Sequence, residues 1–523
     1  MPAATALPFG GPPARRGMVY LVGGGPGDPG LLGLRAARLL STATFVAYDR
    51  LSPPEALSLC RDDAERVYVG KLPDRHALSQ GEIDRLLVER AAAGDAVVRL
   101  KGGDPFVLGR GSEEALACVA AGVPFEVVSA VTAGVAAPAY AGIPVTHRGV
   151  APAFAVVTGH EDPTKGDTQV DYDALARFPG TLLLYMGVGR IGEIAAALVA
   201  GGRAATTPAA LVGWGTTPRQ ETVTGTLADI AARVAAAGLE NPAVIVVGDV
   251  VALRDQIAWF DRRPLHGVSV LVPRTRHQAG ELSERLRALG AEPVEAPTIA
   301  IEPGREPGAL DAALRRVATG AFDWLALTSA NGVDAVWEAV ERLGADARLF
   351  GRARLAAVGP GTAEALAARG LRADLVPDRF TTRGLADALL ATGPPARALL
   401  PRADIATPTL TEALTAGGWT VTEVEAYRTV TVGALPDGVR ARLDAGGIDV
   451  IAFASSSTVR NLVDLLGGPP DPRIRVASIG PVTSATCRDL GLRIDAEADP
   501  SDLDGLVQAV VTAGRAPAAG ALP

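Results

Sequence analysis

Three glycine-rich segments in the first third of the chain hold residue types that commonly contact a bound ligand. They are GGGPGDPG (residues 23–30), KGGDP (residues 101–105) and PAYAGIPVTHRG (residues 138–149). Each follows an apolar, strand-like run or lies in the loop beyond one, which is where open α/β sheets bind their ligands. Glycines allow close approach of the backbone and present N–H groups to a polar ligand. The segments therefore predict a small-molecule site at the carboxyl ends of strands.

Charged side chains accompany these segments. Asp49 ends one apolar run and Lys71 ends the next, so a carboxylate and an ammonium group lie where they can move protons on a ligand. Arg99, Arg110 and Arg148 surround the glycine-rich loops, and arginine binds carboxylates in a bidentate manner that lysine does not match. These residues predict acid–base chemistry on an anionic ligand. The alternative for the first two is that they are solvated loop charges.

The first segment also contains the G-x-G of a dinucleotide-binding loop, at Gly23 and Gly25. The third glycine of that fingerprint would fall at position 28, which is Asp28, and two prolines interrupt the run. A Rossmann loop is therefore disfavoured. A turn with a purely structural role is the other alternative.

The order of the predicted elements indicates an α/β fold for the first half of the chain. Apolar runs alternate with helix-like segments, as in a mostly parallel sheet. A helix is predicted within residues 79–94, because Ser79 and Glu82 match a capping box and Gly94 can end the helix. The predicted strands are residues 18–22, 44–48, 66–69, 97–100 and 125–128, then 154–158, 181–186, 209–213 and 243–248.

These two sets of strands predict two lobes, at about 18–130 and 150–262. A domain boundary is predicted at DRRPLHG (residues 261–267), which is polar and contains a proline and a glycine, and we expect few contacts to cross it. Residues 1–17 and 511–523 are rich in Pro, Gly and Ala. The first of these segments is predicted to be a disordered tail and the second a flexible tail.

The second half contains an internal repeat. The segment from Val270 aligns with the one from Ala398, the segment from Asp323 with that from Asp449, and the segment from Leu355 with that from Val476. Two copies of one small α/β unit predict a bilobed domain with a cleft between its lobes, and clefts of this kind are common ligand sites.

In their order and spacing, the three glycine-rich segments resemble the tetrapyrrole (precorrin-type) methyltransferases, and most closely the uroporphyrinogen-III C-methyltransferases, over residues 18–262. The resemblance implies a two-lobed domain that uses S-adenosylmethionine to methylate uroporphyrinogen III twice, through precorrin-1 to precorrin-2. It also implies that Asp49 accepts a proton, that Lys71 donates one, and that Arg99, Arg110 and Arg148 bind substrate carboxylates. The cofactor positions that it implies are Pro26, Gly102, Gly103, Asp104, Val107, Thr132, Ala133, Met186 and Gly215.

The repeat and the strings TSANGV, VGPGTA and SSSTVRNL resemble uroporphyrinogen-III synthase over residues 267–510. The resemblance implies cyclisation of hydroxymethylbilane to uroporphyrinogen III, the step before methylation. Tyr427 matches a tyrosine that could assist loss of the bilane hydroxyl, with packing as its alternative role. The residues that would line the cleft are Thr328, Ser329, Ser455 and Ser456.

Composition excludes other classes of partner. The net charge is −8 with no basic stretch, so nucleic acid is not expected, and no apolar run reaches the ~18 residues of a membrane span. Three scattered cysteines and five unclustered histidines predict neither disulfides nor a metal site, and agree with a reducing cytoplasm. The resemblance implies a homodimer through the first half. Two alternatives stay open: a sister methyltransferase acting on a later corrin intermediate, and a non-catalytic regulator that binds tetrapyrroles.

Overall fold

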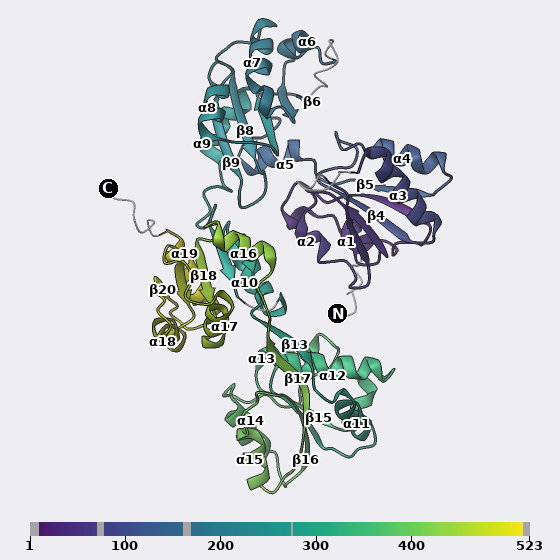
Figure 1. Ribbon diagram of the computed structural model, residues 1–523, viewed down its shortest axis with the longest axis vertical. Coiled ribbons are helices and arrows are strands. Elements are labelled where there is room, and N and C mark those ends of the chain that lie inside the picture. The colour runs from purple at the N-terminus through teal and green to yellow at the C-terminus, as the bar shows by residue number, and fades with distance from the viewer. Residues whose placement is uncertain (1–9, 71–77, 160–168, 274–275, 516–523) are drawn as a thin grey trace.

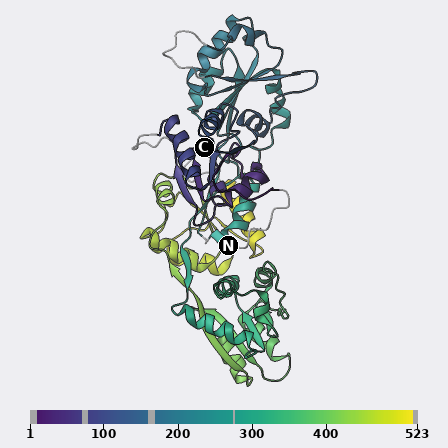
Figure 2. The ribbon, with the colours of Figure 1, turned by 90° about the vertical axis from the view of Figure 1, so that its right-hand side faces the viewer.

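The computed structural model describes residues 10–70, 78–159, 169–273 and 276–515, which form four lobes, each built on a five-stranded sheet (Figure 1). In both views the second and fourth lobes lie at opposite ends of the molecule, and the first and third lie between them (Figures 1 and 2). The mixed α/β architecture predicted from the sequence is confirmed. No helix in the described part of the chain is long and apolar enough to cross a membrane.

The first lobe has a wholly parallel sheet in the order β3-β2-β4-β1-β5. Its strands are β1 (Met18–Gly23), β2 (Phe45–Tyr48), β3 (Glu65–Tyr68), β4 (Ala96–Lys101) and β5 (Phe125–Val128), and its helices are α1 (Leu34–Leu40), α2 (Pro54–Leu57), α3 (Gln80–Ala92) and α4 (Gly111–Ala120). The predicted capping box of α3 is confirmed: Ser79 N–H donates to Glu82 at 2.7 Å, and Glu82 N–H donates to the Ser79 hydroxyl at 3.3 Å. Because the strands are parallel, all their carboxyl ends meet at one edge.

The second lobe follows α5 (Ala133–Tyr140) and has the strand order β6-β7-β10-β8-β9. Its strands are β6 (Phe154–Thr158), β7 (Thr181–Tyr185), β8 (Pro208–Gly213), β9 (Glu221–Thr226) and β10 (Ala243–Val247), and its helices are α6 (Tyr172–Arg177), α7 (Ile191–Ala200), α8 (Ile230–Ala237) and α9 (Arg254–Ile257). Only β6 and β7 pair in parallel, so the predicted mostly parallel sheet is wrong here. β9 was not predicted, because it is an edge strand without an apolar run.

The third lobe has a parallel sheet in the order β12-β11-β18-β19-β20. Its strands are β11 (Ser269–Val272), β12 (Glu292–Glu295), β18 (Val450–Phe453), β19 (Arg475–Ser478) and β20 (Ala496–Glu497), and its helices are α10 (Arg276–Ala288), α16 (Asp437–Asp444), α17 (Ser456–Leu466), α18 (Pro481–Asp489) and α19 (Leu503–Arg515).

The fourth lobe has the order β13-β17-β16-β14-β15, in which only the β13–β17 pair is antiparallel. Its strands are β13 (Ile299–Pro303), β14 (Trp324–Leu327), β15 (Arg354–Ala357), β16 (Arg397–Ala403) and β17 (Thr420–Thr431), and its helices are α11 (Pro307–Ala318), α12 (Ala330–Arg342), α13 (Pro360–Ala367), α14 (Thr382–Leu390) and α15 (Thr409–Ala416).

The two repeat copies do not correspond to the third and fourth lobes. The first copy supplies β11 and β12 to the third lobe but β14 and β15 to the fourth. The second copy supplies β16 and β17 to the fourth lobe and β18 and β19 to the third. Each lobe therefore combines the first two strands of one copy with the last two of the other. The bilobed shape follows from the repeat, but each sheet is completed by strand pairing between the copies.

The boundary at residues 261–267 is more closely packed than the sequence predicted. Leu265 is fully buried in the core of the third lobe, while the His266 ring nitrogen Nε2 lies 2.9 Å from the Gln220 carbonyl oxygen of the second lobe. A Cβ on Gly290 would lie only 2.9 Å from the Cβ of Arg263. Side chains of the junction thus pack on both sides of the boundary, and the expectation of few contacts between the two halves stays a prediction.

The described parts of both predicted tails are also structured. The Ala14 N–H donates to the Thr42 hydroxyl and the Arg15 N–H to the Tyr20 hydroxyl, at 2.9 and 2.8 Å. Residues 511–515 continue α19, because Ala513 packs into the core of the third lobe.

Candidate functional site

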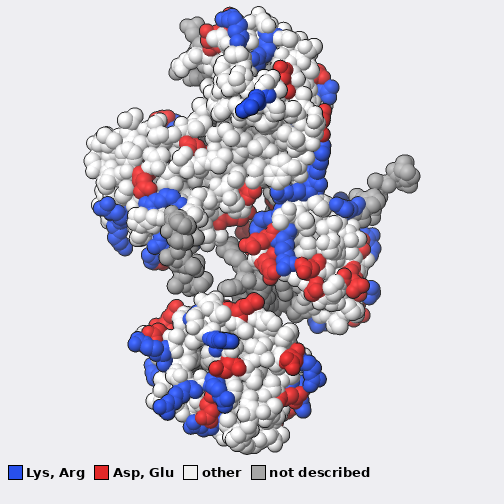
Figure 3. Space-filling model, turned by 180° about the vertical axis from the view of Figure 1, so that it is seen from behind, with Lys and Arg blue, Asp and Glu red and all other residues white. Residues whose placement is uncertain are grey.

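A cavity of about 780 Å³ lies where the first, second and third lobes meet. Its lining comes from the loops after β1, β2, β4, β7 and β8, from α5, and from α10, β12 and α16 of the third lobe. A volume of this size suits a cofactor or a drug-sized ligand. Figure 3 shows basic and acidic side chains gathered around the hollow between these lobes.

The glycine-rich loops after β1 and β4 form part of this lining through their backbone. Gly103 N–H donates to the Gly25 carbonyl oxygen at 2.7 Å, which joins the two loops. A Cβ on Gly102 would lie 2.6 Å from the Leu51 carbonyl oxygen, so only glycine allows this packing. Gly103 has φ +65°, a conformation that L side chains rarely adopt. The backbones of the two loops thus pair with each other, and Gly102 and Gly103 bring backbone without a side chain to the cavity lining.

Asp104 holds the second of these loops in shape. Its carboxylate accepts hydrogen bonds from the Phe106 N–H at 2.8 Å, from the Ala130 N–H at 3.0 Å and from the Ser129 hydroxyl. Because these three donors engage its oxygens and only 7% of the residue is exposed, the side chain mainly orders the loop.

Strained backbone gathers at the same cavity. Leu108, Met186, Trp214 and Thr216 all line it, and all have positive φ, between 46° and 69°. Positive φ is uncommon outside glycine, and such residues cluster at functional sites.

A polar contact joins the first and second lobes beside the cavity. The Tyr185 hydroxyl, at the end of β7, lies 2.6 Å from the Thr132 hydroxyl and accepts a hydrogen bond from Gly134 N–H at the start of α5. Burial raises the pKa of Tyr185 above its ordinary value of 10.0, so the phenol stays protonated. Gly215 packs so closely on α5 that a Cβ would lie 2.2 Å from the Cβ of Ala137.

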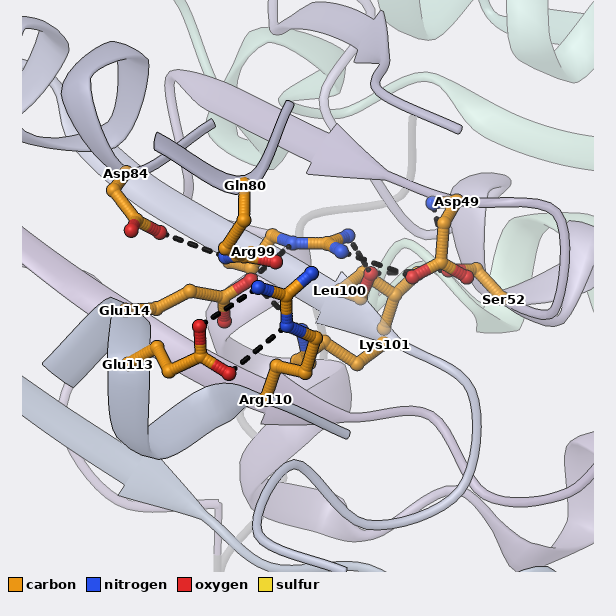
Figure 4. Close-up of polar contacts among 10 residues, drawn as sticks. All are labelled: Asp49, Ser52, Gln80, Asp84, Arg99, Leu100, Lys101, Arg110, Glu113 and Glu114. Carbon is orange, nitrogen blue, oxygen red and sulfur yellow. Dashed lines mark hydrogen bonds and ion pairs between the residues drawn. The ribbon is translucent and has the colours of Figure 1, made fainter. Parts of the chain in front are cut away.

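Four charged groups form a network behind the cavity (Figure 4). Arg99 Nη2 lies 3.0 Å from Asp49 Oδ2, and Arg99 Nε lies 3.1 Å from Glu114 Oε1, which also binds Lys101 Nζ at 2.8 Å. Arg99, Lys101 and Glu114 are buried, and Asp49 is the member whose side chain reaches the cavity. Burial, helped by the charge of Arg99, lowers the pKa of Lys101 below 10.5. The network balances two positive and two negative groups, and holds Asp49 in place.

The structure gathers the predicted cofactor positions around one cavity. Gly215 lies between two lining residues, Trp214 and Thr216. Asp49 lines the cavity, and Lys71 lies outside the described residues. The predicted positions that line the cavity themselves are Pro26, Gly102, Gly103, Asp104, Val107, Thr132, Ala133 and Met186.

The arginines predicted to bind substrate are not in the lining. Arg99 is buried behind it in the charge network, and Arg110 is exposed and paired with Glu113 at 2.8 Å. Arg148 lies on the surface. The arginines that do line the cavity were not predicted, because loop motifs carry no signal for contacts between distant lobes. These lining arginines are Arg50, Arg219, Arg263, Arg287 and Arg442.

In the second half, the structure brings Tyr427 and Ser329 together, with their hydroxyl oxygens 2.9 Å apart. Tyr427 is 7% exposed and lines a second cavity of about 340 Å³ in the fourth lobe. Ser329 also caps α12 by accepting a hydrogen bond from Gly332 N–H at 3.0 Å, and Thr328 beside it is half-buried.

Ser455 and Ser456 lie in the third lobe, at the start of α17. The Ser455 hydroxyl accepts a hydrogen bond from Thr458 N–H at 3.4 Å, and the Ser456 hydroxyl donates to the Val482 carbonyl oxygen at 3.2 Å. The two N-cap serines, Ser329 and Ser455, are equivalent in the repeat and serve the same local role in different lobes. Capping is thus at least part of the reason for these hydroxyl-rich strings.

Among the residues that the structure describes, no group of three or more His, Cys, Asp or Glu could hold a metal ion. The three cysteines are free and buried. Burial raises the pKa of Cys118 and Cys487 to about 11, which keeps both thiols protonated.

Comparison with known proteins gives two family matches, one in each half. The model of the tetrapyrrole (corrin/porphyrin) methylases matches residues 18–231, and that of uroporphyrinogen-III synthase HemD matches residues 280–508. Porphyrin biosynthesis protein HemD from Ruminiclostridium josui is 34% identical over 499 residues, 95% of this chain and 98% of the relative. Uroporphyrinogen-III C-methyltransferase from Bacillus subtilis is 44% identical over 283 residues, 54% of this chain and 58% of the relative.

Among solved structures, uroporphyrin-III C-methyl transferase from Thermus thermophilus, complexed with S-adenyl homocysteine, is 44% identical. The match covers 45% of this chain and 93% of that protein, with a TM-score of 0.39.

Proposed function

The chain belongs to the family that joins a tetrapyrrole methylase domain to a uroporphyrinogen-III synthase domain, and we propose from this premise that it performs two consecutive reactions of tetrapyrrole biosynthesis. The second half cyclises hydroxymethylbilane to uroporphyrinogen III. The first half methylates that product twice, through precorrin-1 to precorrin-2. The observation that carries the proposal is that both domains occur in one chain and match a relative over nearly its whole length.

S-adenosylmethionine is the proposed methyl donor, and the residues of the cavity fit it. At Gly102 and Gly103 the lining is backbone without a side chain, which permits the close approach of a cofactor. Met186 and Val107 add apolar surface. When bound, this cofactor supplies an electrophilic methyl group. The same loops would hold it in the cavity that Asp49 also lines.

Asp49 is the proposed proton acceptor. A pyrrole carbon that gains a methyl group must lose a proton from the ring, and a fixed carboxylate at the cavity surface suits that task. Arg99 binds one oxygen of Asp49, while the Leu51 N–H donates to the other at 3.1 Å, so the carboxylate is held in one orientation. Arg99 thus acts as a positioning residue and not as a substrate ligand. Lys71 keeps its proposed role as proton donor.

Carboxylate recognition is assigned to the arginines of the cavity. Uroporphyrinogen III carries eight carboxylates, and the first two lobes place Arg50, Arg219 and Arg263 in the lining. Arg219 stacks 3.9 Å from the Trp214 ring centroid, which orients its guanidinium. Arg110 and Arg148, on the surface, are proposed to act only on carboxylates that extend beyond the cavity.

In the synthase half, Tyr427 is proposed to assist departure of the bilane hydroxyl, with Ser329 as its hydrogen-bond partner. Thr328, Ser455 and Ser456 remain proposed contacts of the substrate. Tyr427→Phe should slow cyclisation, and the methylase activity of the same variant is the internal control. Because spontaneous closure of the bilane yields uroporphyrinogen I, the ratio of the III isomer to the I isomer measures how much of the product the enzyme formed. An unchanged rate and ratio would show that Tyr427 only packs.

The proposal extends to cellular location, oligomeric state and partners. We place the protein in the cytoplasm and expect homodimers through the first half, with tetrapyrroles as its partners and neither nucleic acid nor membrane. Sedimentation at several concentrations tests the dimer.

The methylase assignment is tested by incubating the full chain with uroporphyrinogen III and methyl-labelled S-adenosylmethionine. Two labelled methyl groups should enter each tetrapyrrole. Binding of the cofactor without any methylation of uroporphyrinogen III would contradict the assignment, and would favour a later corrin intermediate as substrate.

A further inference from the structure

The third lobe forms part of the same cavity as the glycine-rich loops of the first. Arg287 lies at the end of α10, Glu292 begins β12 and Arg442 lies on α16, and all three line the cavity together with Pro26 and Asp49. The methylase cavity is therefore bounded on one side by the synthase half of the chain.

Polar contacts hold the third lobe against the cavity. Arg442 binds both oxygens of Glu292, at 2.9 and 2.7 Å, within the third lobe. Arg219 of the second lobe comes within 4.0 Å of Glu292, and Arg263 Nη1 donates to the Arg287 carbonyl oxygen at 3.4 Å. These contacts fix the α10–β12 loop beside the methylase lobes.

The charges that line the cavity differ in whether they are already paired. Asp49, Asp104 and Glu292 are each bound by cations or amides of the protein, and Arg442 is occupied by Glu292. Arg287 has no side-chain hydrogen bond or acidic partner among the described residues, although it is half-buried. Two positions earlier on the same helix, Arg285 pairs with Glu281 at 2.6 Å and also with Asp504. Arg287 is thus a cation that faces a cavity and is available to an anion.

We propose that the synthase half supplies Arg287 as a carboxylate-binding residue of the methylase site, so that the methylase substrate site is completed by its fusion partner. The inference rests on the proposed function, because the substrate bears eight carboxylates. A guanidinium that is half-buried and unpaired gains a charge-assisted, bidentate partner when a carboxylate arrives. Arg263, whose guanidinium stacks 4.5 Å from the Phe260 ring centroid, is placed to act beside it.

The position of Arg287 also separates the two sites. It precedes β12, at the amino ends of the parallel strands, whereas Ser455 follows β18, at their carboxyl ends. The amino ends of the third-lobe strands thus face the proposed methylase site, and their carboxyl ends carry the serines of the proposed synthase site.

The test uses the full chain and steady-state methylation at saturating S-adenosylmethionine, with uroporphyrinogen III varied. Arg287→Ala should raise KM for uroporphyrinogen III about tenfold or more, the usual scale for losing one charge-assisted hydrogen bond. kcat should change little, and cofactor affinity and the rate of cyclisation should stay at the wild-type values. Arg287→Lys should restore part of the loss. Added salt should raise KM more in the wild type than in Arg287→Ala, since only the wild type has the ion pair to screen.

Arg285→Ala is the matched control, because it removes an arginine from the same helix that lies outside the cavity. Its KM should equal that of the wild type. An unchanged KM in Arg287→Ala, in a chain that methylates uroporphyrinogen III, would overturn this inference and leave the proposed function intact. Failure of the wild type to methylate uroporphyrinogen III would overturn the proposed function itself. Normal cyclisation by Arg287→Ala would show that its third lobe is folded.

Discussion

Arg99 donates to Asp49 over 3.0 Å, and the guanidinium that holds this carboxylate is itself buried against Glu114. Asp49 is thus the exposed end of a chain of charges that begins inside the first lobe. Its orientation depends on Arg99 and Glu114, which do not line the cavity. This arrangement separates two roles, proton transfer at the cavity surface and positioning behind it, and the two can be tested one at a time.

Asp49→Asn keeps the size and the hydrogen-bonding oxygen of the side chain but removes the base. Methylation should fall by about 10²–10⁴-fold, the usual range for a positioned acid or base, while calorimetry shows unchanged binding of S-adenosylmethionine. Methyl incorporation by the variant at the wild-type rate would refute the assignment.

Glu114→Gln should destabilise the first lobe, because Glu114 is the buried counter-ion of both Arg99 and Lys101. Removing one partner from a buried ionic network costs about 3–5 kcal/mol. Hydrogen exchange of the β4 amides measures the loss locally. The double variant Glu114→Gln/Lys101→Met should recover part of it, since one uncompensated cation is removed.

Glu113→Gln is the control for Glu114→Gln. Glu113 lies next to Glu114 in sequence, but its ion pair with Arg110 is exposed, and exposed pairs contribute about 0–1 kcal/mol. Equal exchange rates in the Glu113 and Glu114 variants would show that the buried network does not stabilise this lobe.

Gly103→Arg should abolish binding of S-adenosylmethionine. Any side chain is strained at φ +65°, and a Cβ there would point toward the Ala133 and Thr132 backbone, so a long side chain fills space in the proposed cofactor site. Gly33→Ala is the control, because no atom lies within 4 Å of the added Cβ. Calorimetry should show no heat of binding for the first variant and wild-type affinity for the second. Retained affinity in Gly103→Arg would place the cofactor elsewhere.

Stability of the third lobe should depend on pH through Glu292. Burial opposes its ionisation, but the hydrogen bonds and charge of Arg442 outweigh burial, so the pKa lies below its ordinary value of 4.5. Between the two pKa values the unfolded chain binds more protons than the folded one. The stabilisation is therefore present above pH 4.5 and is lost as the pH falls through the folded pKa.

Glu292→Gln lacks that group and should show a flatter decline. Hydrogen exchange of the β12 amides in acid measures both proteins. Parallel pH profiles of the wild type and the variant would contradict this account of Glu292.

Local features were readable from the sequence because neighbouring residues determine them. The capping box of α3 and the glycine loops after β1 and β4 depend on a few adjacent residues. The positive φ of Met186 and Trp214 was not readable, since tertiary packing imposes it on residue types that do not favour it.

Contacts between residues far apart in the sequence could not be predicted. The repeat revealed two copies, but nothing local shows that β11 pairs with β18 of the other copy. Nor could any motif show that Arg287 reaches the methylase cavity. Arg99 was predicted to bind substrate because it lies two residues before the KGGDP segment, yet its strand is buried on both faces and its guanidinium pairs with Asp49 and Glu114.

The most direct measurement supplies purified full-length protein with hydroxymethylbilane, with and without S-adenosylmethionine, and identifies the tetrapyrroles that accumulate. Without S-adenosylmethionine the product should be uroporphyrinogen III, and with it the product should be precorrin-2. Uroporphyrinogen I as the only product in both reactions would contradict the synthase assignment. Uroporphyrinogen III that stays unmethylated when S-adenosylmethionine is present would contradict the methylase assignment.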